Sequence, residues 1–441
     1  MYVERVRLEN IRGFTGGRNV DLRLPSPGWT VIAGRNGSGK TSLLRAIALA
    51  VAGPDVARSL VPDFAKWVSS RSVEGSVFLG LAYDAALDSG TRLPALFDTP
   101  RTTGVELVWS GADQRSLFAE NQPTLNGRVR GDSKRLWQPN PVGWFCAAYG
   151  PFRRLAGGAR DAQKLMRSHG PVARLASLFD EDASLAEGVG WLIDQHLRSL
   201  EGKPGAEKLK DVALRVLGDG LLPDGYRIEG VDSDGLWVEH DDHQFPLREM
   251  SDGYRTVTAL VVDLIKQIND CFGELPVEVV DGRSVITAPG TVIIDKVDAH
   301  LHVSWQKRIG TWLKEHFPRI QFIVTTHSPY VCQAADPGGL IRLSGPDVDE
   351  PPRVVSTDLY ERIVYGTGDD AVLSELFGLD TPYSPRAVEL REQLAELEFR
   401  VAAGQADDSE VARWNELRDL LSSSPVTRTT EVANRAEADD R

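Results

Sequence analysis

The segment GRNGSGKTS, residues 34–42, carries the combination of side chains in this sequence that is best suited to chemistry. It fits the pattern G-x-x-x-x-G-K-[ST] of a loop that binds phosphate groups, in which glycines let backbone N–H groups face the phosphate oxygens. In this pattern Lys40 reaches the β- and γ-phosphates of a nucleotide, and Thr41 offers its hydroxyl to Mg²⁺. The residues expected to contact ATP are Gly34, Asn36, Gly37, Ser38, Gly39, Lys40, Thr41 and Ser42.

Two apolar runs later in the chain each lead to a polar residue that could join this phosphate loop. TVIID ends in Asp295, and IQFIVTT leads into His327. Continuous apolar runs are typical of parallel strands that are covered on both faces. We expect Asp295 to orient Mg²⁺ or its water shell, and His327 to sense the γ-phosphate. Either residue taken alone could also have a purely structural role.

A third polar group, Ser251 to Gly253 in MSDGYR, lies at the start of an expected amphipathic helix. The N-terminus of a helix carries free N–H groups and a partial positive charge, so it can bind an anion. An ordinary serine N-cap explains Ser251 equally well. The segment gains a functional meaning only together with the phosphate loop.

The elements that must position these residues follow from hydrophobic periodicity. Alternating apolar residues predict strands over residues 3–11 and 20–24, and a short buried strand at 29–34 precedes a helix from Lys40 to about residue 51. Residues 52–145 are less regular and predict an insertion or β subdomain, whereas residues 152–218 predict a helical subdomain. Two amphipathic helices follow near the end of the chain, and we expect an apolar face of this pair, with Leu394, Leu397 and Trp414, to dock a partner chain or a second copy. A helical hairpin packed on its own head is the alternative.

Composition restricts the class of protein. Of 441 residues, 41% are hydrophobic and 26% are charged, which is typical of a globular chain. The net charge of −13 argues against a protein that coats nucleic acid by bulk charge, although a local basic patch stays open. The basic residues that could form such a patch, or instead a solvated face or internal pairs, are Arg128, Arg130, Lys134, Arg135, Arg153, Arg154 and Arg160.

Cysteine usage and hydropathy bear on the compartment. The three cysteines form no CxxC pair, so neither a disulfide framework nor a cysteine zinc site is expected. The charged N-terminus does not resemble a signal peptide, and no apolar run approaches the ~18 residues that cross a bilayer. We therefore expect a cytoplasmic protein without a membrane partner.

In their order along the chain, these motifs resemble an ABC-type ATPase head. The segments NIRGF, VDAHLH and TTHSP look like the RecF/SMC/OLD-like branch of the AAA family rather than a transporter. Within that branch, AYGPFRRL, SLFDEDASL and SDGYRT are similar to bacterial ATPases of Septu-type and retron-associated anti-phage systems. The resemblance covers roughly residues 2–345.

The resemblance implies an α/β fold, a P-loop ABC-type ATPase head in which a parallel core sheet adjoins a β-rich lobe. It places this head at residues 1–345, with the β subdomain and the helical subdomain inside it. A C-terminal helical extension is expected over residues 346–422, and residues 423–441 are expected to be a disordered tail.

The resemblance also assigns roles. The phosphate loop becomes Walker A, Ser251 and Gly253 belong to the signature motif, Asp295 is Walker B and His327 is the switch histidine, while Asp298 lies in the D-loop region. Arg12 is expected to flank the adenine. In such families two heads sandwich two ATP molecules, and the signature serine of one head touches the γ-phosphate held by the other. A homodimer or higher oligomer is therefore implied, with ATP and Mg²⁺ as cofactors.

Two positions depart from the family pattern. No glutamine stands where a Q-loop is expected, and AYGPFRR occupies that region. Lys296 follows Asp295 at the catalytic position where the pattern has a glutamate that polarises the attacking water. A lysine ammonium has three donors and no acceptor. We therefore expect this chain to bind ATP but to hydrolyse it slowly or not at all.

The function implied by the resemblance is that of an ATPase subunit of a bacterial anti-phage complex. It would act with a separate effector such as an HNH-type nuclease, because the chain shows no nuclease motif of its own. Two alternatives stay open. Lys296 favours a nucleotide-gated scaffold that does not hydrolyse ATP, and the short middle segment is also compatible with a RecF-like DNA-repair ATPase.

Overall fold

The computed structural model describes two compact units, Met1–Gly378 and a second unit from Leu379 onward, and each is described by itself. The residues described are 1–61, 63–64, 66–69, 72–83, 88, 101–110, 124–130, 134–138, 141, 143–153, 165–166 and 170–421. The expected tail at 423–441 and the basic residues Arg154 and Arg160 lie outside this part of the chain.

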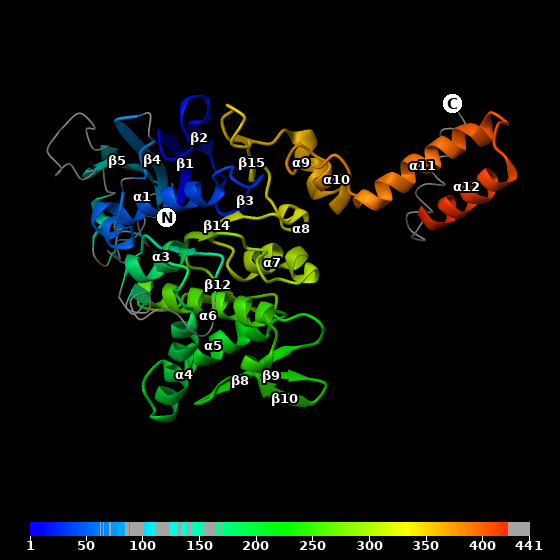
Figure 1. The fold of residues 1–441 in the computed structure, drawn as a ribbon. Coiled ribbons are helices and arrows are strands. Elements are labelled where there is room, and N and C mark those ends of the chain that lie inside the picture. The colour runs from blue at the N-terminus through cyan, green and yellow to red at the C-terminus, as the bar shows by residue number, and fades with distance from the viewer. Residues whose placement is uncertain are drawn as a thin grey trace. The chain divides into compact units, whose positions relative to one another are not determined.

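A six-stranded sheet forms the centre of the first unit, in the order β16-β15-β3-β14-β13-β7 (Figure 1). All neighbouring pairs are parallel except β15 with β16. The bounds of these strands are Gly28–Gly34 for β3, Cys146–Tyr149 for β7, Gly290–Ile294 for β13, Ile320–Thr325 for β14, Leu340–Leu343 for β15 and Arg353–Val354 for β16. Every residue of β13 and β14 is buried, as the continuous apolar runs predicted.

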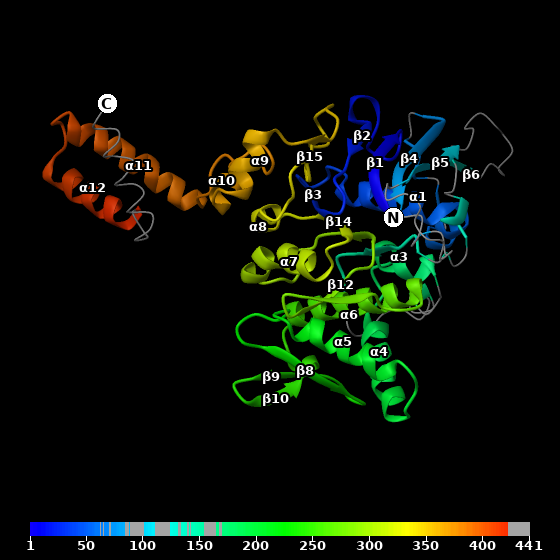
Figure 2. The same cartoon turned by 180° about the vertical axis from the view of Figure 1, so that it is seen from behind.

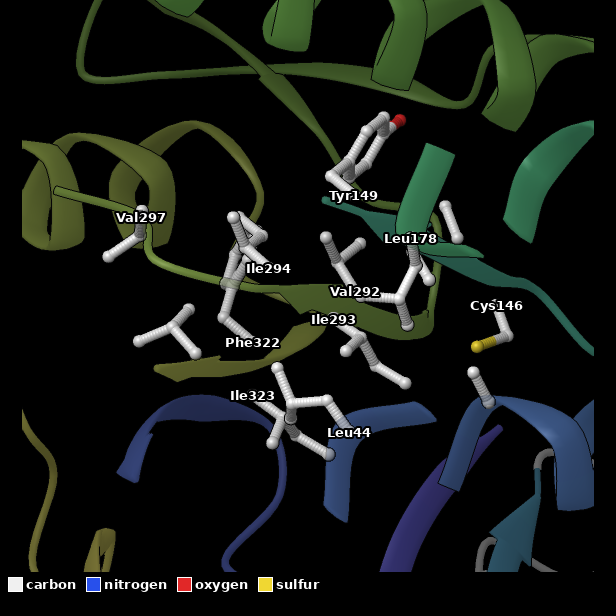
Figure 3. Close-up of a cluster of buried hydrophobic side chains, with 14 of the residues drawn as sticks. Leu44, Cys146, Tyr149, Leu178, Val292, Ile293, Ile294, Val297, Phe322 and Ile323 are labelled. Carbon is white, nitrogen blue, oxygen red and sulfur yellow. The ribbon is translucent and has the colours of Figure 1, made fainter. Parts of the chain in front are cut away.

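Parallel pairing places the carboxyl ends of β3, β13 and β14 at one edge of this sheet. Ile294 pairs with Val324, and Thr325 pairs with Ile32. Side chains of α1 and α3 join those of β7, β13 and β14 in one buried cluster, which includes Leu44, Leu178 and Ile323 (Figure 3). The loops that follow the three strands are the ones that carry the predicted site residues.

An antiparallel five-stranded sheet, in the order β2-β1-β4-β5-β6, forms the β-rich lobe. The strands are β1 (Tyr2–Glu9), β2 (Val20–Arg23), β4 (Glu74–Tyr83), β5 (Arg101–Ser110) and β6 (Thr124–Arg130). Because β4 pairs directly with β1, the expected insertion at residues 52–145 shares one sheet with the N-terminal strands. Helix α1 (Lys40–Leu60) contacts both this sheet and the core sheet.

The helical part comprises α3 (Pro171–Phe179), α4 (Ala186–Leu200) and α5 (Ala206–Gly218). Helix α6 (Asp252–Phe272) lies beside α4 and α5 in both views (Figures 1 and 2). A small antiparallel sheet precedes α6, with β8 (Arg227–Asp232), β9 (Gly235–His240) and β10 (His243–Pro246). After α6 come the hairpin β11 (Val277–Val280) and β12 (Arg283–Ile286), then α7 (Val303–His316) and the short α8 (Pro329–Cys332).

The first unit extends beyond the expected head boundary at residue 345, as far as Gly378. Strand β16 pairs with β15, and α9 (Thr357–Val364) and α10 (Gly368–Val372) contact α8. The Tyr360 hydroxyl donates to the Ala335 carbonyl at 2.8 Å, and Gln333 donates to the Gly366 carbonyl at 3.0 Å. The structure thus corrects the boundary, because the first part of the expected extension is held to the head by backbone acceptors. With that correction, the predicted α/β head with a parallel core sheet, a β-rich lobe and a helical subdomain is confirmed.

The second unit is a helical hairpin of α11 (Pro385–Ala402) and α12 (Asp408–Leu421). No residue of α11 is buried, and Leu417 is the buried residue of α12. Phe399 is 74% exposed. The hairpin leaves apolar surface for a partner, which stays a prediction. Across the described residues, no helix has the length and apolarity that crossing a membrane requires.

Candidate nucleotide-binding site

The phosphate loop leaves β3 and enters α1 through glycines that other residues could not replace. Gly37 and Gly39 have φ angles of 78° and 103°, in the left-handed region that favours glycine. A Cβ atom on Gly39 would lie 2.7 Å from Cζ of Phe14. The Ser38 hydroxyl in this loop is buried and has no hydrogen-bond partner among the described residues. The loop therefore has the compact curl and the spare polar group expected of a phosphate cradle.

Lys40 begins α1 and folds its side chain back over this loop. Its ammonium donates to the carbonyls of Gly34 at 2.6 Å and Arg35 at 3.1 Å. Burial lowers the pKa of Lys40 to about 8, with the nearby Lys296 acting in the same direction and Asp295 and Asp298 opposing it. A phosphate in the loop would supply the negative charge that favours the protonated form.

Asp295 lies at the end of β13 and joins the phosphate loop to β14. One carboxylate oxygen accepts the Thr41 hydroxyl at 2.7 Å, and the other accepts the hydroxyl of Thr325. Asp295 is only 2% exposed. Carboxylate and hydroxyl oxygens are the ligands that Mg²⁺ prefers. Thr41 and Asp295, each expected from sequence to meet Mg²⁺, are thus in direct contact, and their binding of the ion stays a prediction.

His327 follows β14 at the same edge. The loop is fixed by Asp298, whose carboxylate accepts the Thr326 hydroxyl at 2.5 Å and faces the His327 N–H at 3.4 Å. Desolvation lowers the pKa of His327, and the positive charges of Lys40 and Lys296 lower it further. The imidazole is therefore neutral at physiological pH and can donate or accept a hydrogen bond.

Lys296 has a fixed backbone and an exposed side chain. Its N–H donates to the Thr325 hydroxyl at 2.8 Å, and its φ angle of 47° is left-handed. Its ammonium lies close enough to depress the pKa of both Lys40 and His327. Lys296 therefore adds positive charge on the phosphate side of the site and supplies no acceptor there.

Arg153 is the residue of this region that the sequence prediction treated only as one of several basic residues. It is 2% exposed, and its guanidinium donates to the carbonyls of Gly150, Asp295, Lys296, Val297 and Ala299 at 3.0–3.4 Å. Burial lowers its pKa to about 10, against the opposing effect of Asp298 and Asp295. Arg153 thus holds residues 295–299, which we call the Asp295 loop, to the end of β7. The sequence gives no signal for this role, because the role depends on the pairing of β7 with β13.

Arg12 and Arg18 lie around the other side of the phosphate loop. Arg12 stacks its guanidinium on Trp67 at 4.5 Å and donates to the Ser42 hydroxyl at 3.4 Å. Burial lowers the pKa of Arg12, and the charge of Arg45 adds to this effect. Arg18, which the sequence prediction missed, donates to the Ser38 carbonyl at 3.0 Å. Arg12 is therefore beside the loop, as expected, and its contact with adenine stays a prediction.

Ser251 is the N-cap of α6, as predicted, but its side chain accepts no capping hydrogen bond and is exposed. Gly253 is required by packing, because a Cβ atom there would lie 2.4 Å from the His300 carbonyl. Among the described residues, the Ser251 side chain forms no hydrogen bond with the phosphate loop or the Asp295 loop. The structure therefore brings residues 34–42, Asp295 and His327 to one edge of the sheet, whereas Ser251 forms no hydrogen bond with them within the described chain.

Comparison with known proteins gives two family matches. Residues 5–71 match an AAA domain, and residues 198–333 match the family described as "AAA domain, putative AbiEii toxin, Type IV TA system". The first range includes the phosphate loop, and the second includes Ser251, Asp295 and His327.

Similar curated proteins include the Septu protein PtuA of Bacillus mycoides, 24% identical over 338 residues, which are 74% of this chain and 38% of the relative. The Retron Ec83 probable ATPase of Escherichia coli is 38% identical over 101 residues, 23% of this chain and 17% of the relative. The Septu protein PtuA of Bacillus thuringiensis is 30% identical over 175 residues, 38% and 42% of the two chains. This chain thus spans less than half the length of the curated relatives it matches.

A solved structure of an SMC head bound to the C-terminal winged-helix domain of ScpA has a TM-score of 0.48 and 18% identity, covering 80% of this chain and 98% of that chain. The resemblance to Septu and retron ATPases that the motifs predicted is confirmed by the sequence relatives.

Proposed function

We propose that this chain binds ATP with Mg²⁺ at the edge of the core sheet and serves as the ATPase subunit of an anti-phage defence complex. The observation that carries this proposal is that Lys40 and Thr41, which begin α1, lie beside Asp295, which follows β13, with Thr41 and Asp295 in direct contact. The defence role is supported by the similarity to Septu and retron proteins.

ATP binding would exchange contacts that the protein already makes. The Lys40 ammonium would leave the carbonyls of Gly34 and Arg35 and meet the β- and γ-phosphates. The buried hydroxyl of Ser38 would gain an acceptor. Thr41 and Asp295 would hold Mg²⁺, which neutralises and orients the phosphate oxygens.

We further propose that two heads sandwich ATP, giving a homodimer or a higher oligomer. The support is the exposed, uncapped Ser251 at a helix N-terminus, which can donate to a phosphate held by another copy. A self-complementary face of this kind closes naturally with two-fold symmetry. The sandwich would report nucleotide state to a separate effector, for which we propose an HNH-type nuclease. We also propose that nucleic acid binds directly to the assembled complex.

Lys296 supports slow hydrolysis within this function. Its ammonium lies near Lys40 and His327 and would pair with the γ-phosphate rather than activate water. The same observation favours the second candidate, a nucleotide-gated scaffold in which bound ATP holds the dimer and is not turned over.

The test compares the natural chain with Lys296→Glu and with the double variant Lys296→Glu/Asp295→Asn, using single-turnover ATP hydrolysis and a separate ATP-binding titration. All three proteins are first checked to be folded. We expect Lys296→Glu to hydrolyse ATP about 10²–10⁴-fold faster than the natural chain, which is the usual contribution of a positioned base. The double variant should lose that gain. Rapid turnover by the natural chain, with no gain from glutamate, would contradict the assigned role of this position.

A further inference from the structure

A cavity of about 740 Å³ opens between α4, α5 and α6, away from the phosphate loop in sequence and in lining residues. The three helices lie side by side in both views (Figures 1 and 2). None of the residues assigned to ATP binding lines it. Its volume falls in the range of about 300–1,000 Å³ that is usual for small-molecule sites.

Arg174 of α3 lines this cavity and is 4% exposed. Its Nε–H is buried, and no residue in the described part of the chain forms a hydrogen bond with it. Within the described residues, its guanidinium forms no ion pair with a carboxylate. A buried charge without a partner is costly, so proteins seldom keep one unless something else supplies the opposite charge.

The groups nearest to Arg174 do not supply that charge. Its electrostatic neighbours include the thiols of Cys146 and Cys271. Burial raises the pKa of Cys146 to about 12 and raises the pKa of Cys271, so both thiols are neutral at physiological pH. The two thiols therefore supply no negative charge to the guanidinium, which also lines the cavity.

Two acidic residues that line the cavity have cationic partners in the same lining, and Glu187, Glu274 and Lys208 line it as well. Asp194 pairs with Arg198 at 3.9 Å, and Asp270 pairs with Lys266 at 3.2 Å. Arg174 is the buried cation of this lining, and no described carboxylate, Glu187 and Glu274 included, forms an ion pair with it. The cavity thus offers one desolvated, strongly directional site for an anion.

The remaining walls suit the rest of a small organic ligand. Trp191 is half-buried in the lining and can contact a flat ring. Gln195 and Gln267 are buried there and carry carboxamides that donate and accept hydrogen bonds. Arginine binds phosphate groups in a bidentate geometry that few other side chains provide.

We propose that this cavity binds a small phosphorylated ligand of mononucleotide size, with its phosphate on Arg174 and its ring against Trp191. This site is separate from the ATP site. A metabolite bound there would contact α4, α5 and α6 and could stabilise one arrangement of these helices.

The test uses inorganic phosphate and AMP as probes, with calorimetric titration and thermal melting of the full chain. Both probes are measured in a Lys40→Ala background, which removes the main cation of the phosphate loop and so isolates the second site. We expect saturable binding of both, at least about ten-fold weaker in Arg174→Met, as a charge-assisted hydrogen bond predicts. Trp191→Ala should weaken AMP and leave inorganic phosphate unchanged. Arg227→Gln, an exposed arginine outside the cavity, is the matched control.

Thermal melting separates a ligand site from a structural arginine. Without ligand, Arg174→Met should melt at the same temperature as its parent or higher, because it removes an unpaired buried charge, and the rise in melting temperature caused by AMP should disappear. Failure of both probes to bind at millimolar concentration overturns the proposal. So does binding that survives Arg174→Met, or a lower melting temperature of Arg174→Met with unchanged probe binding.

Discussion

The phosphate-binding edge and the N-terminus of α6 are the two halves of the expected ATP site, and they differ in how many of their polar groups are already bonded within the chain. At the edge, Lys40, Thr41 and Asp295 all have protein partners. At the start of α6, Ser251 is exposed and has no capping hydrogen bond.

This difference indicates which half can work alone. The edge is built from the ends of three neighbouring strands, and its loops are fixed by the buried side chains of Arg153 and Asp295. The start of α6 is positioned by the close approach of Gly253 to the His300 carbonyl. The side chain of Ser251, however, forms no capping hydrogen bond within the described chain. A single head should therefore bind ATP through the edge, and the α6 half should matter only when a second head is present. The four predictions below rank variants and conditions by their effect on the ATP affinity of a single head.

Lys40→Ala should have the largest effect on ATP affinity. The variant loses the cation that meets the β- and γ-phosphates, and each charge-assisted contact contributes about 1.5–3 kcal/mol. We expect affinity to fall at least about 100-fold by calorimetric titration, since two such contacts are lost. Lys203→Ala, which removes an exposed lysine paired with Glu201, is the matched control. Equal ATP affinity in Lys40→Ala and its parent would show that residues 34–42 are not the nucleotide site.

Arg153→Met should have the next largest effect. It removes the donor for carbonyls of the Asp295 loop, which then lie buried without a partner. We expect the free energy of unfolding to fall by about 3 kcal/mol, as for loss of one partner of a buried charged network. At a temperature where the variant is folded, ATP affinity should fall about ten-fold in the presence of Mg²⁺ and much less in its absence, because the loop carries Asp295. A loss of affinity that is the same with and without Mg²⁺ would assign Arg153 to general stability alone.

Raising the pH should weaken ATP binding through Lys40. Its pKa is about 8 in the free protein, whereas the bound triphosphate favours the protonated form. Above pH 8 the free lysine is mostly neutral, so binding must take up a proton, and affinity should be about ten-fold lower at pH 9 than at pH 7. Titrations in two buffers of different ionisation enthalpy should detect proton uptake at pH 9. Lys40→Ala should show neither the uptake nor the pH dependence, and proton release by the natural chain would contradict the assignment.

The part of this site that could be predicted from sequence is the part encoded in short, contiguous segments. Residues 34–42 and the apolar strands ending near Asp295 and His327 carry their geometry locally, because a parallel sheet brings strand ends to one edge. That rule predicts that the segments after β3 and β13 lie at the same edge, and the structure adds the direct contact between Thr41 and Asp295.

The rest depends on contacts between distant segments. In the sequence Arg153 cannot be distinguished from an arginine on the surface. Only the pairing of β7 with β13 brings it to the Asp295 loop. Arg18 reaches the Ser38 carbonyl from a separate turn. The head boundary was misplaced for the same reason, because the hydrogen bonds that hold residues 346–378 to the head join segments without a recognisable motif.

Ser251→Arg should have the smallest effect on a single head, and this is the sharpest test of the comparison. The substituted side chain would project from an exposed N-cap that contacts none of the edge residues, so ATP affinity measured at low protein concentration should change less than about two-fold, as surface substitutions usually do. The same variant should lose any ATP-dependent increase in native mass, because a bulky cation at the proposed interface would clash with a second head and displace the serine from its phosphate. Ser251→Ala is the conservative control, which keeps the space and removes only the hydroxyl, and it should weaken the ATP-dependent assembly to a smaller degree. If Ser251→Arg reduced the affinity of the isolated head as strongly as Lys40→Ala, the two halves would act within one chain. If it left ATP-dependent assembly intact, the sandwich proposal would fail while the ATP site at the edge would stand.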